Sequence, residues 1–114
     1  MGLTENRRLF FRIRGKCRIL ISSHAFKDHP ERNFTKQELV NFVKRGAGSF
    51  QKNDSAMAIS GSYQFLVRDD EERPCKLVIL IEEEIIEGSK GGPPNKETII
   101  KACSAYREVN NESN

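Results

Sequence analysis

The sequence predicts an α+β domain in which an N-terminal strand and one or two helices precede an antiparallel sheet of four to five strands. Residues 36–45 carry the start signal and the apolar face of a helix. Apolar runs separated by short polar links follow Gly46, a pattern typical of successive antiparallel strands. At 114 residues the chain has room for one core. We therefore expect the helices to lie on one side of a single sheet.

The composition is that of a folded domain in a reducing compartment. We divide the chain into an N-terminal arm (1–10), a single α+β domain (11–107) and a disordered tail (108–114). No apolar run approaches the about 20 residues of a membrane helix, and no secretory signal follows the first arginines. The three cysteines lie in apolar contexts, which favours buried thiols over a disulfide or a metal site. We expect a cytoplasmic protein without a membrane partner, metal or cofactor.

Residues 11–21 alternate between apolar and polar side chains, which predicts the first strand. Its polar side carries four cations: Arg12, Arg14, Lys16 and Arg18. Such a row can follow a phosphate backbone, and a charged edge strand that prevents aggregation has the same pattern. The acids gather later, at 69–72 and 82–84, so the charge distribution indicates a polyanionic partner for one face.

Two helical segments are predicted after this strand. Ser23 is a candidate cap for a short turn of helix from His24, Pro30 predicts a kink, and Asn33 a corner. The longer helix runs over 36–45, because Thr35 and Glu38 form a capping box and Gly46 follows the last apolar turn.

The remaining chain predicts strands at 49–52, 56–59, 63–68, 75–81 and 98–104, with 75–81 as the central strand. Residues 82–96 are polar and interrupted by glycine and proline, so we expect a flexible excursion there.

An ordered set of short motifs spans residues 18–106. A Ser-x-His-Ala motif is followed, eight residues after the histidine, by an arginine, and Ser-Ala-Tyr closes the last strand. The matching residues are Ser22, His24, Ala25, Arg32, Thr35, Ser104, Ala105 and Tyr106, while Asn33 replaces a glycine of the pattern and Phe34 an aliphatic residue. This set resembles the small bacterial family known as domain of unknown function 4258. Asp28 stands where that family usually has an arginine, and Pro30 interrupts the helix.

The resemblance implies a fold and an activity. The family looks like a relative of RelE-type toxins and of barnase- or colicin-type ribonucleases, which place one or two helices before a curved antiparallel sheet. It therefore implies a toxin-type ribonuclease that acts on RNA without a metal and has an antitoxin or other protein partner. The alternative is a non-catalytic domain of the same fold that binds RNA or a protein.

Cleavage of RNA without a metal needs an acid, a base and a cation at the phosphate. His24 is the candidate acid or base, Arg32 the candidate phosphate ligand, and Asp28 could orient either of them. Ser104 and Tyr106 complete the candidate catalytic set. The candidate RNA contacts are Arg12, Arg14, Lys16, Arg18, Tyr63 and Arg68.

Structural roles are the alternatives for the same residues. His24 could cap the turn after the first strand, or bind a metal with Asp28 and His29, whereas an exposed position is expected for His29. Arg32 could form a surface ion pair with Glu31 or Glu38. The two tyrosines could be aromatic residues of the core or its rim.

Overall fold

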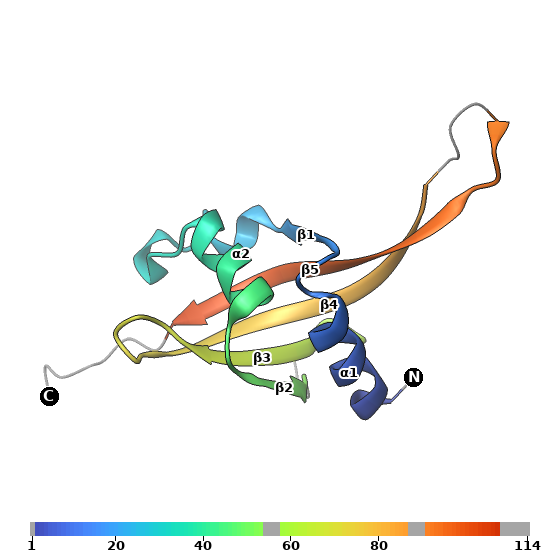
Figure 1. Cartoon of the computed structure of the whole chain (residues 1–114). Coiled ribbons are helices and arrows are strands. Elements are labelled where there is room, and N and C mark those ends of the chain that lie inside the picture. Colours follow the sequence, from blue (N-terminus) through green and yellow to red (C-terminus); the bar gives the residue numbers. More distant parts are fainter. Residues whose placement is uncertain (1, 54–57, 87–90, 108–114) are drawn as a thin grey trace, which may run out of the picture.

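The computed structural model of this chain describes residues 2–53, 58–86 and 91–107, and within them it has the expected α+β class. Two helices and two short 3-10 turns are combined with five strands (Figure 1). The elements are α1 (Leu3–Ile13), β1 (Arg18–Ile21), η1 (Ser23–Ala25), η2 (Pro30–Arg32), α2 (Lys36–Arg45), β2 (Ser49–Lys52), β3 (Tyr63–Arg68), β4 (Pro74–Ile86) and β5 (Asn95–Arg107).

The strands form one open sheet in the order β1-β5-β4-β3-β2. Strands β2 to β5 pair antiparallel, which confirms the four antiparallel strands expected after the helices. Strand β1 runs parallel to β5, a direction that the sequence did not predict. The first and last strands are neighbours that no tight turn connects. Turn geometry therefore does not impose an antiparallel direction on this pair.

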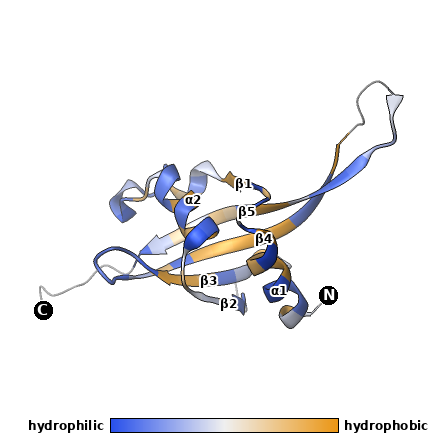
Figure 2. Ribbon diagram, viewed as in Figure 1, coloured by the Kyte–Doolittle hydropathy of each residue, from blue (hydrophilic) through white to orange (hydrophobic). Residues whose placement is uncertain are grey.

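Both helices pack on one face of the sheet, and the core lies between the two layers (Figure 1). Phe10 of α1 stacks on Phe50 of β2 with ring centroids 4.7 Å apart and meets Phe65 of β3 edge-on at 4.8 Å. Leu39 and Val43 of α2 are fully buried in the same cluster. Figure 2 shows the hydrophobic residues concentrated along the middle of the sheet, where the two layers meet.

Residues 3–13 form a helix. The predicted strand over 11–21 is therefore wrong at 11–13, and the predicted N-terminal arm over 1–10 is wrong at 3–10. Leu3, Phe10 and Ile13 follow helical spacing and bury one face, with Phe10 fully inaccessible. Phe11 and Ile13 lie two residues apart at the end of this helix, and that spacing by itself resembles the alternation of a strand. Only the last part of the predicted segment is a strand, where Ile19 and Ile21 of β1 face the core.

The segment after β1 agrees closely with the prediction. Ser22, one residue before the predicted cap, accepts the backbone N–H of His24 at 3.3 Å and begins η1. Asn33 turns the corner in the left-handed conformation, with φ 56°. Thr35 accepts the N–H of Glu38 at 3.1 Å and begins α2, which has the predicted bounds.

The strands at 49–52 and 63–68 are confirmed, and the two central strands are longer than predicted. Residues 82–86 continue β4 and pair with residues 95–99 of β5, so these parts of the predicted flexible excursion are regular strand. Pairing between the two arms of this hairpin maintains the polar stretch as strand, and the composition of each arm alone does not reveal the pairing. Residues 58–59 of the predicted strand 56–59 are not strand, whereas 56–57 and the predicted tail 108–114 lie outside the described residues.

Candidate nucleic-acid interface

Tyr106 lies near the end of β5, on the sheet face opposite the helices. Its neighbours in sequence, Ala105 and Arg107, point toward the helical layer and are buried. Lys76 of β4 is directly opposite Tyr106, and Val78 is opposite Ser104. A β-bulge between Val78 and Ile79 shifts the register of β4 against β5 and so determines these two pairs. Lys76, Ser104 and Tyr106 therefore share the sheet face opposite the helices, where Tyr106 is exposed and Ser104 is buried.

Two cations flank the Tyr106 ring. The Arg32 guanidinium carbon is 4.2 Å from the ring centroid, and the Lys76 ammonium nitrogen is 4.9 Å from it. Tyr106 is 39% exposed, so this arrangement is open to solvent. We call Arg32, Lys76 and Tyr106 the Tyr106 cluster.

The fold positions Arg32 through the edge of β5. Strand β1 ends where Ile21 pairs with Ala102, so in the described parts of the chain the β5 edge beyond this point has no neighbouring strand. Arg32 donates Nη1–H to the carbonyl of Ala105 at 2.9 Å and so occupies part of that edge. In the described residues it forms no ion pair with Glu31 or Glu38, the alternative suggested by the sequence.

A cavity of about 840 Å³ opens beside the Tyr106 cluster. Its lining includes three cations (Arg68, Lys76, Arg107) and two acids (Asp69, Glu72), together with Tyr106. Arg68 donates Nη1–H to the carbonyl of Glu72 at 2.8 Å at the rim. A smaller cavity of about 110 Å³ on the other side is lined by Ser104, Asn53 and Gln64 as well as Lys76 and Tyr106.

His24 belongs to a separate group on η1 and the turn after it. Its Nδ1 is 2.8 Å from Oδ2 of Asp28, and both side chains are about half exposed. The ring of His29, which is only partly exposed, meets the His24 ring edge-on at 5.2 Å. Among the described residues no hydrogen bond or ion pair joins His24 to Arg32 or Tyr106. The structure therefore brings Arg32, Tyr106, Ser104 and Arg68 into one region and pairs His24 with Asp28 in a separate group.

The predicted row of cations does not form, because its members lie on three different elements. Arg12 is exposed on α1, Lys16 is in the turn after it, and Arg18 of β1 forms an ion pair with Glu84 of β4. Arg14 donates Nη1–H to the carbonyl of Gly46 at 2.6 Å and lies over the Phe11 ring at 4.8 Å. Burial lowers the pKa of this Arg14 guanidinium. A continuous phosphate-binding strand is therefore excluded.

Tyr63 is also a structural residue rather than a base-stacking surface. Its ring stacks on Phe50, with centroids 4.8 Å apart, and its hydroxyl accepts a hydrogen bond from Asn6 of α1. It lies on the helix-covered face of β3, against the core. The interpretation as a core or rim aromatic is the right one for this tyrosine.

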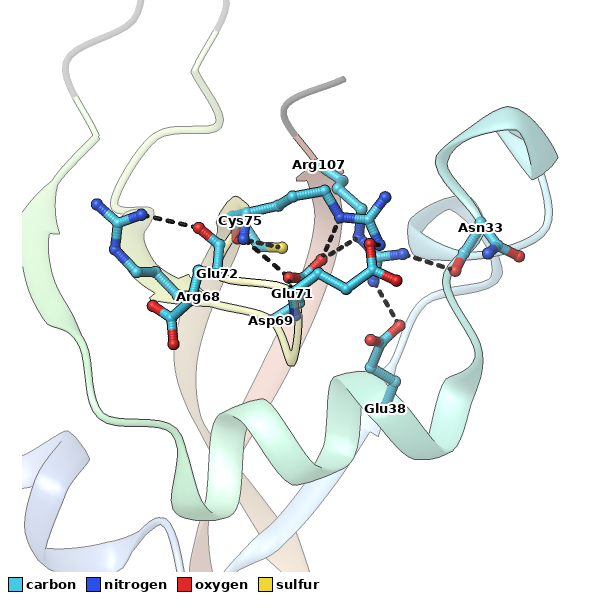
Figure 3. A network of polar contacts seen from close by, with 9 residues as sticks. Asn33, Glu38, Arg68, Asp69, Glu71, Glu72, Cys75 and Arg107 are labelled. Atoms are coloured by element: carbon cyan, nitrogen blue, oxygen red, sulfur yellow. Dashed lines mark hydrogen bonds and ion pairs between the residues drawn. The ribbon is translucent and has the colours of Figure 1, made fainter. Parts of the chain in front are cut away.

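The sequence did not identify Lys76 or the buried polar network around Arg107 (Figure 3). Arg107 donates to Glu38 Oε1 at 2.6 Å and to the Asn33 carbonyl at 3.1 Å, and its Nε is 3.3 Å from Asp69 Oδ2. Its guanidinium also lies over the Phe34 ring at 4.3 Å. The network joins the end of β5 to α2, to the corner at Asn33 and to the β3–β4 turn, so it supports the wall of the large cavity.

Burial on its own would raise the pKa of Asp69, but its hydrogen bonds outweigh that effect. The backbone N–H groups of Arg73 and Glu71 each donate to Oδ1 at 2.9 Å, and the Arg73 guanidinium donates to Oδ2 at 2.8 Å. These contacts hold the pKa of the carboxyl below its usual range. Asp69 is therefore a structural carboxylate.

The cysteines and the metal-ligating side chains define no further site. Cys17, Cys75 and Cys103 are free thiols, as the sequence predicts, and burial raises the pKa of each. In the described portions of the chain, no three metal-ligating side chains converge. No helix within those portions is long and apolar enough to span a membrane.

Comparison of the chain with protein-family models, with curated proteins and with solved structures gave no match. Its function is therefore inferred from the chemistry of the Tyr106 cluster and of the His24–Asp28 pair.

Proposed function

We propose that the protein binds single-stranded RNA on the open sheet face around Tyr106. The observation that carries this proposal is an exposed aromatic ring between two cations, 4.2 Å and 4.9 Å from its centroid, at the mouth of a cavity of about 840 Å³. Proteins that bind single strands combine cations, which contact phosphates, with aromatic rings on which bases stack. The family resemblance of the sequence supports RNA as the nucleic acid.

The three members of the cluster have different roles in this proposal. Arg32 uses one of its donors for the Ala105 carbonyl, so the remaining donors of its fixed guanidinium are available to a phosphate. Lys76 is on a flexible stem and can move from the ring to a second phosphate, so that a base takes its place. Arg68, at the rim of the cavity, is placed to contact a third phosphate.

Fluorescence anisotropy with a labelled single-stranded RNA oligonucleotide tests this proposal. Replacing Tyr106 by Ala removes a stacking surface worth about 1–3 kcal/mol per base, so the Kd should rise about tenfold, whereas Tyr106→Phe should retain most of the affinity. Lys76→Gln removes one phosphate contact, so the slope of log K for RNA binding against log salt should become less steep by about 0.7. Lys36→Gln, on the exposed start of α2, is the matched control for lost charge. Equal affinities for the wild type, Tyr106→Ala and Lys36→Gln would refute binding at this face.

A second candidate function is cleavage of the bound RNA, and the contact of 2.8 Å between His24 and Asp28 favours it. A carboxylate beside imidazole Nδ1 orients the ring and leaves Nε2 to exchange a proton with the substrate. A toxin of this kind would act in the cytoplasm and be restrained by an antitoxin.

Cleavage is tested separately from binding. With a metal chelator present, His24→Ala should abolish cleavage of a single-stranded RNA and Asp28→Asn should slow it about 10- to 100-fold, while both variants retain RNA affinity. His29→Ala is the control, because its Nδ1 is paired with Glu31 at 3.1 Å. Cleavage that survives in His24→Ala would exclude this role, and absence of cleavage in the wild type would leave binding as the function.

A further inference from the structure

The other end of the sheet carries a second surface, formed by residues 80–86 of β4 and 95–98 of β5, which we call the β4–β5 ribbon. Strand β3 accompanies β4 only as far as the pair between Tyr63 and Ile79. Strand β1 begins beside β5 only at Ile99. The ribbon therefore extends beyond the rest of the sheet, as Figure 1 shows, and contributes to a longest dimension of 63 Å.

Among the described residues no strand pairs with the outer edge of β4 over residues 80–86. The unpaired backbone groups of such an edge are a template for another strand, and natural proteins usually shorten or cover an edge of this length. Ile85 is 70% exposed and Ile86 44% exposed beside it. The edge thus offers both hydrogen-bonding groups and apolar contact area.

The charge of the ribbon restricts what can pair with it. The β4–β5 ribbon contains four glutamates (82, 83, 84 and 97) and one lysine (96), so its net charge is −4 + 1 = −3. A nucleic acid would be repelled by this surface. A second copy paired antiparallel about Glu83 would place each glutamate of 82–84 opposite another, and like charges directly opposite are destabilising.

We propose that the outer edge of β4 at residues 80–86 binds an extended, lysine- or arginine-rich segment of a partner protein as an added strand. Backbone hydrogen bonds supply the affinity in this mode, and the side chains select the sequence. Glu82 and Glu83 are exposed and select basic residues, whereas Glu84 is already paired with Arg18. Glu82 and Glu83 point to opposite faces of the ribbon, as do Ile85 and Ile86, so the matching segment has two adjacent basic residues followed or preceded by two adjacent aliphatic residues. This surface lies at the opposite end of β5 from Tyr106, so the proposal does not depend on RNA binding.

The probe is a short peptide in which a Val-Val pair and a Lys-Lys pair are separated by one threonine, so that antiparallel addition places the valines opposite 85–86 and the lysines opposite 82–83; it is titrated into the ¹⁵N-labelled full chain. Two peptides serve as comparisons: one in which glutamate replaces lysine, and one with the same lysines whose backbone amides on one edge are N-methylated. The chemical shifts and the hydrogen-exchange rates of the amides of residues 80–86 are measured for each peptide. The double variant Glu82→Lys/Glu83→Lys tests the charge, with Asp70→Lys/Glu71→Lys in the exposed β3–β4 turn as the matched control.

The lysine–valine peptide should shift and protect amides of residues 80–86. N-methylation of the peptide, and the charge reversal at 82 and 83, should each weaken binding at least tenfold, and the control variant should leave the affinity unchanged. Four results would overturn the proposal: no change in residues 80–86, equal affinity for the N-methylated or the acidic peptide, dimerisation of the free chain through residues 80–86, or perturbation of those residues by an RNA oligonucleotide. The charge-reversal variant changes only exposed side chains, so its spectrum outside the β4–β5 ribbon reports that the fold is retained.

Discussion

Single residues in this protein divide into those that support the site and those that are available to a ligand. Arg107, with 5% of its side chain exposed, contacts three segments: α2 through Glu38, the β3–β4 turn through Asp69, and the corner before α2 through the Asn33 carbonyl and the Phe34 ring. Tyr106 beside it is 39% exposed and faces away from the core. Adjacent positions on one strand thus have opposite roles, because successive side chains point to opposite faces of the sheet.

Replacing Arg107 by Ala should lower the free energy of unfolding by about 2–4 kcal/mol, because it leaves Glu38 and Asp69 without their common cation. Urea denaturation followed by circular dichroism measures this change. Arg45→Ala removes an exposed cation from the end of α2 and is the matched control, with an expected change below about 0.5 kcal/mol. A loss in Arg107→Ala no larger than in the control would show that the buried network does not stabilise the fold.

The lowered pKa of Asp69 predicts how stability depends on pH. A carboxyl whose folded pKa is depressed contributes stability that is fully present above its unfolded pKa, about 3.9, and is lost as the pH falls through the folded pKa. The difference in unfolding free energy between the wild type and Asp69→Asn should therefore be largest at neutral pH and shrink below about pH 4. Urea titrations over a pH series measure it. A difference that stays constant from neutral to acidic pH would contradict the assigned ionisation.

At the scale of elements, local chemistry determined what could be predicted. The bounds of α2 follow from Thr35 and Glu38, because a capping box acts within one turn of chain. The sequence predicted a strand where α1 ends, because the spacing of Phe11 and Ile13 fits both a strand and a helix. The contact that stabilises the helix, Phe10 on Phe50, joins residues far apart in the sequence, so the local pattern does not reveal it. The length of β4 and β5 likewise depends on their mutual pairing.

The connection between α2 and β2 passes so close to β3 that only glycine fits at one position. A Cβ added to Gly48 would overlap the carbonyl oxygen of Leu66 and lie 2.7 Å from Cγ1 of Val67. Gly48→Ala should therefore lower the unfolding free energy by about 1–3 kcal/mol.

Gly15→Ala is the matched control for this substitution, because nothing lies within 4 Å of an added Cβ there. Its stability should be unchanged or raised by up to about 1 kcal/mol through the unfolded state. Thermal denaturation of both variants measures the contrast. Equal melting temperatures for the two alanine variants would show that the backbones of residues 48 and 66 are not in close contact.

At the scale of the whole molecule, the two ends of the sheet differ in charge: the Tyr106 end combines cations with the acids of 69–72, whereas the β4–β5 ribbon is mainly acidic. The Tyr106 cluster and Arg68 provide cations at one end of the sheet, and the β4–β5 ribbon carries a net charge of −3 at the other. The sequence located the acids of this asymmetry and, through the motif spacing, Arg32 and Tyr106. It did not locate Lys76. Lys76 lies opposite Tyr106 only because of the register between β4 and β5, and these two residues are about thirty positions apart in the chain.

The position of RNA on the ¹⁵N-labelled protein tests the central claim most directly. A single-stranded oligonucleotide is titrated at low salt while the amide chemical shifts are followed by NMR. Binding around Tyr106 predicts that the largest changes fall on Arg68, Lys76 and residues 104–106, and that they diminish as salt is added. Changes confined to α1, or none anywhere on the open sheet face, would contradict the account.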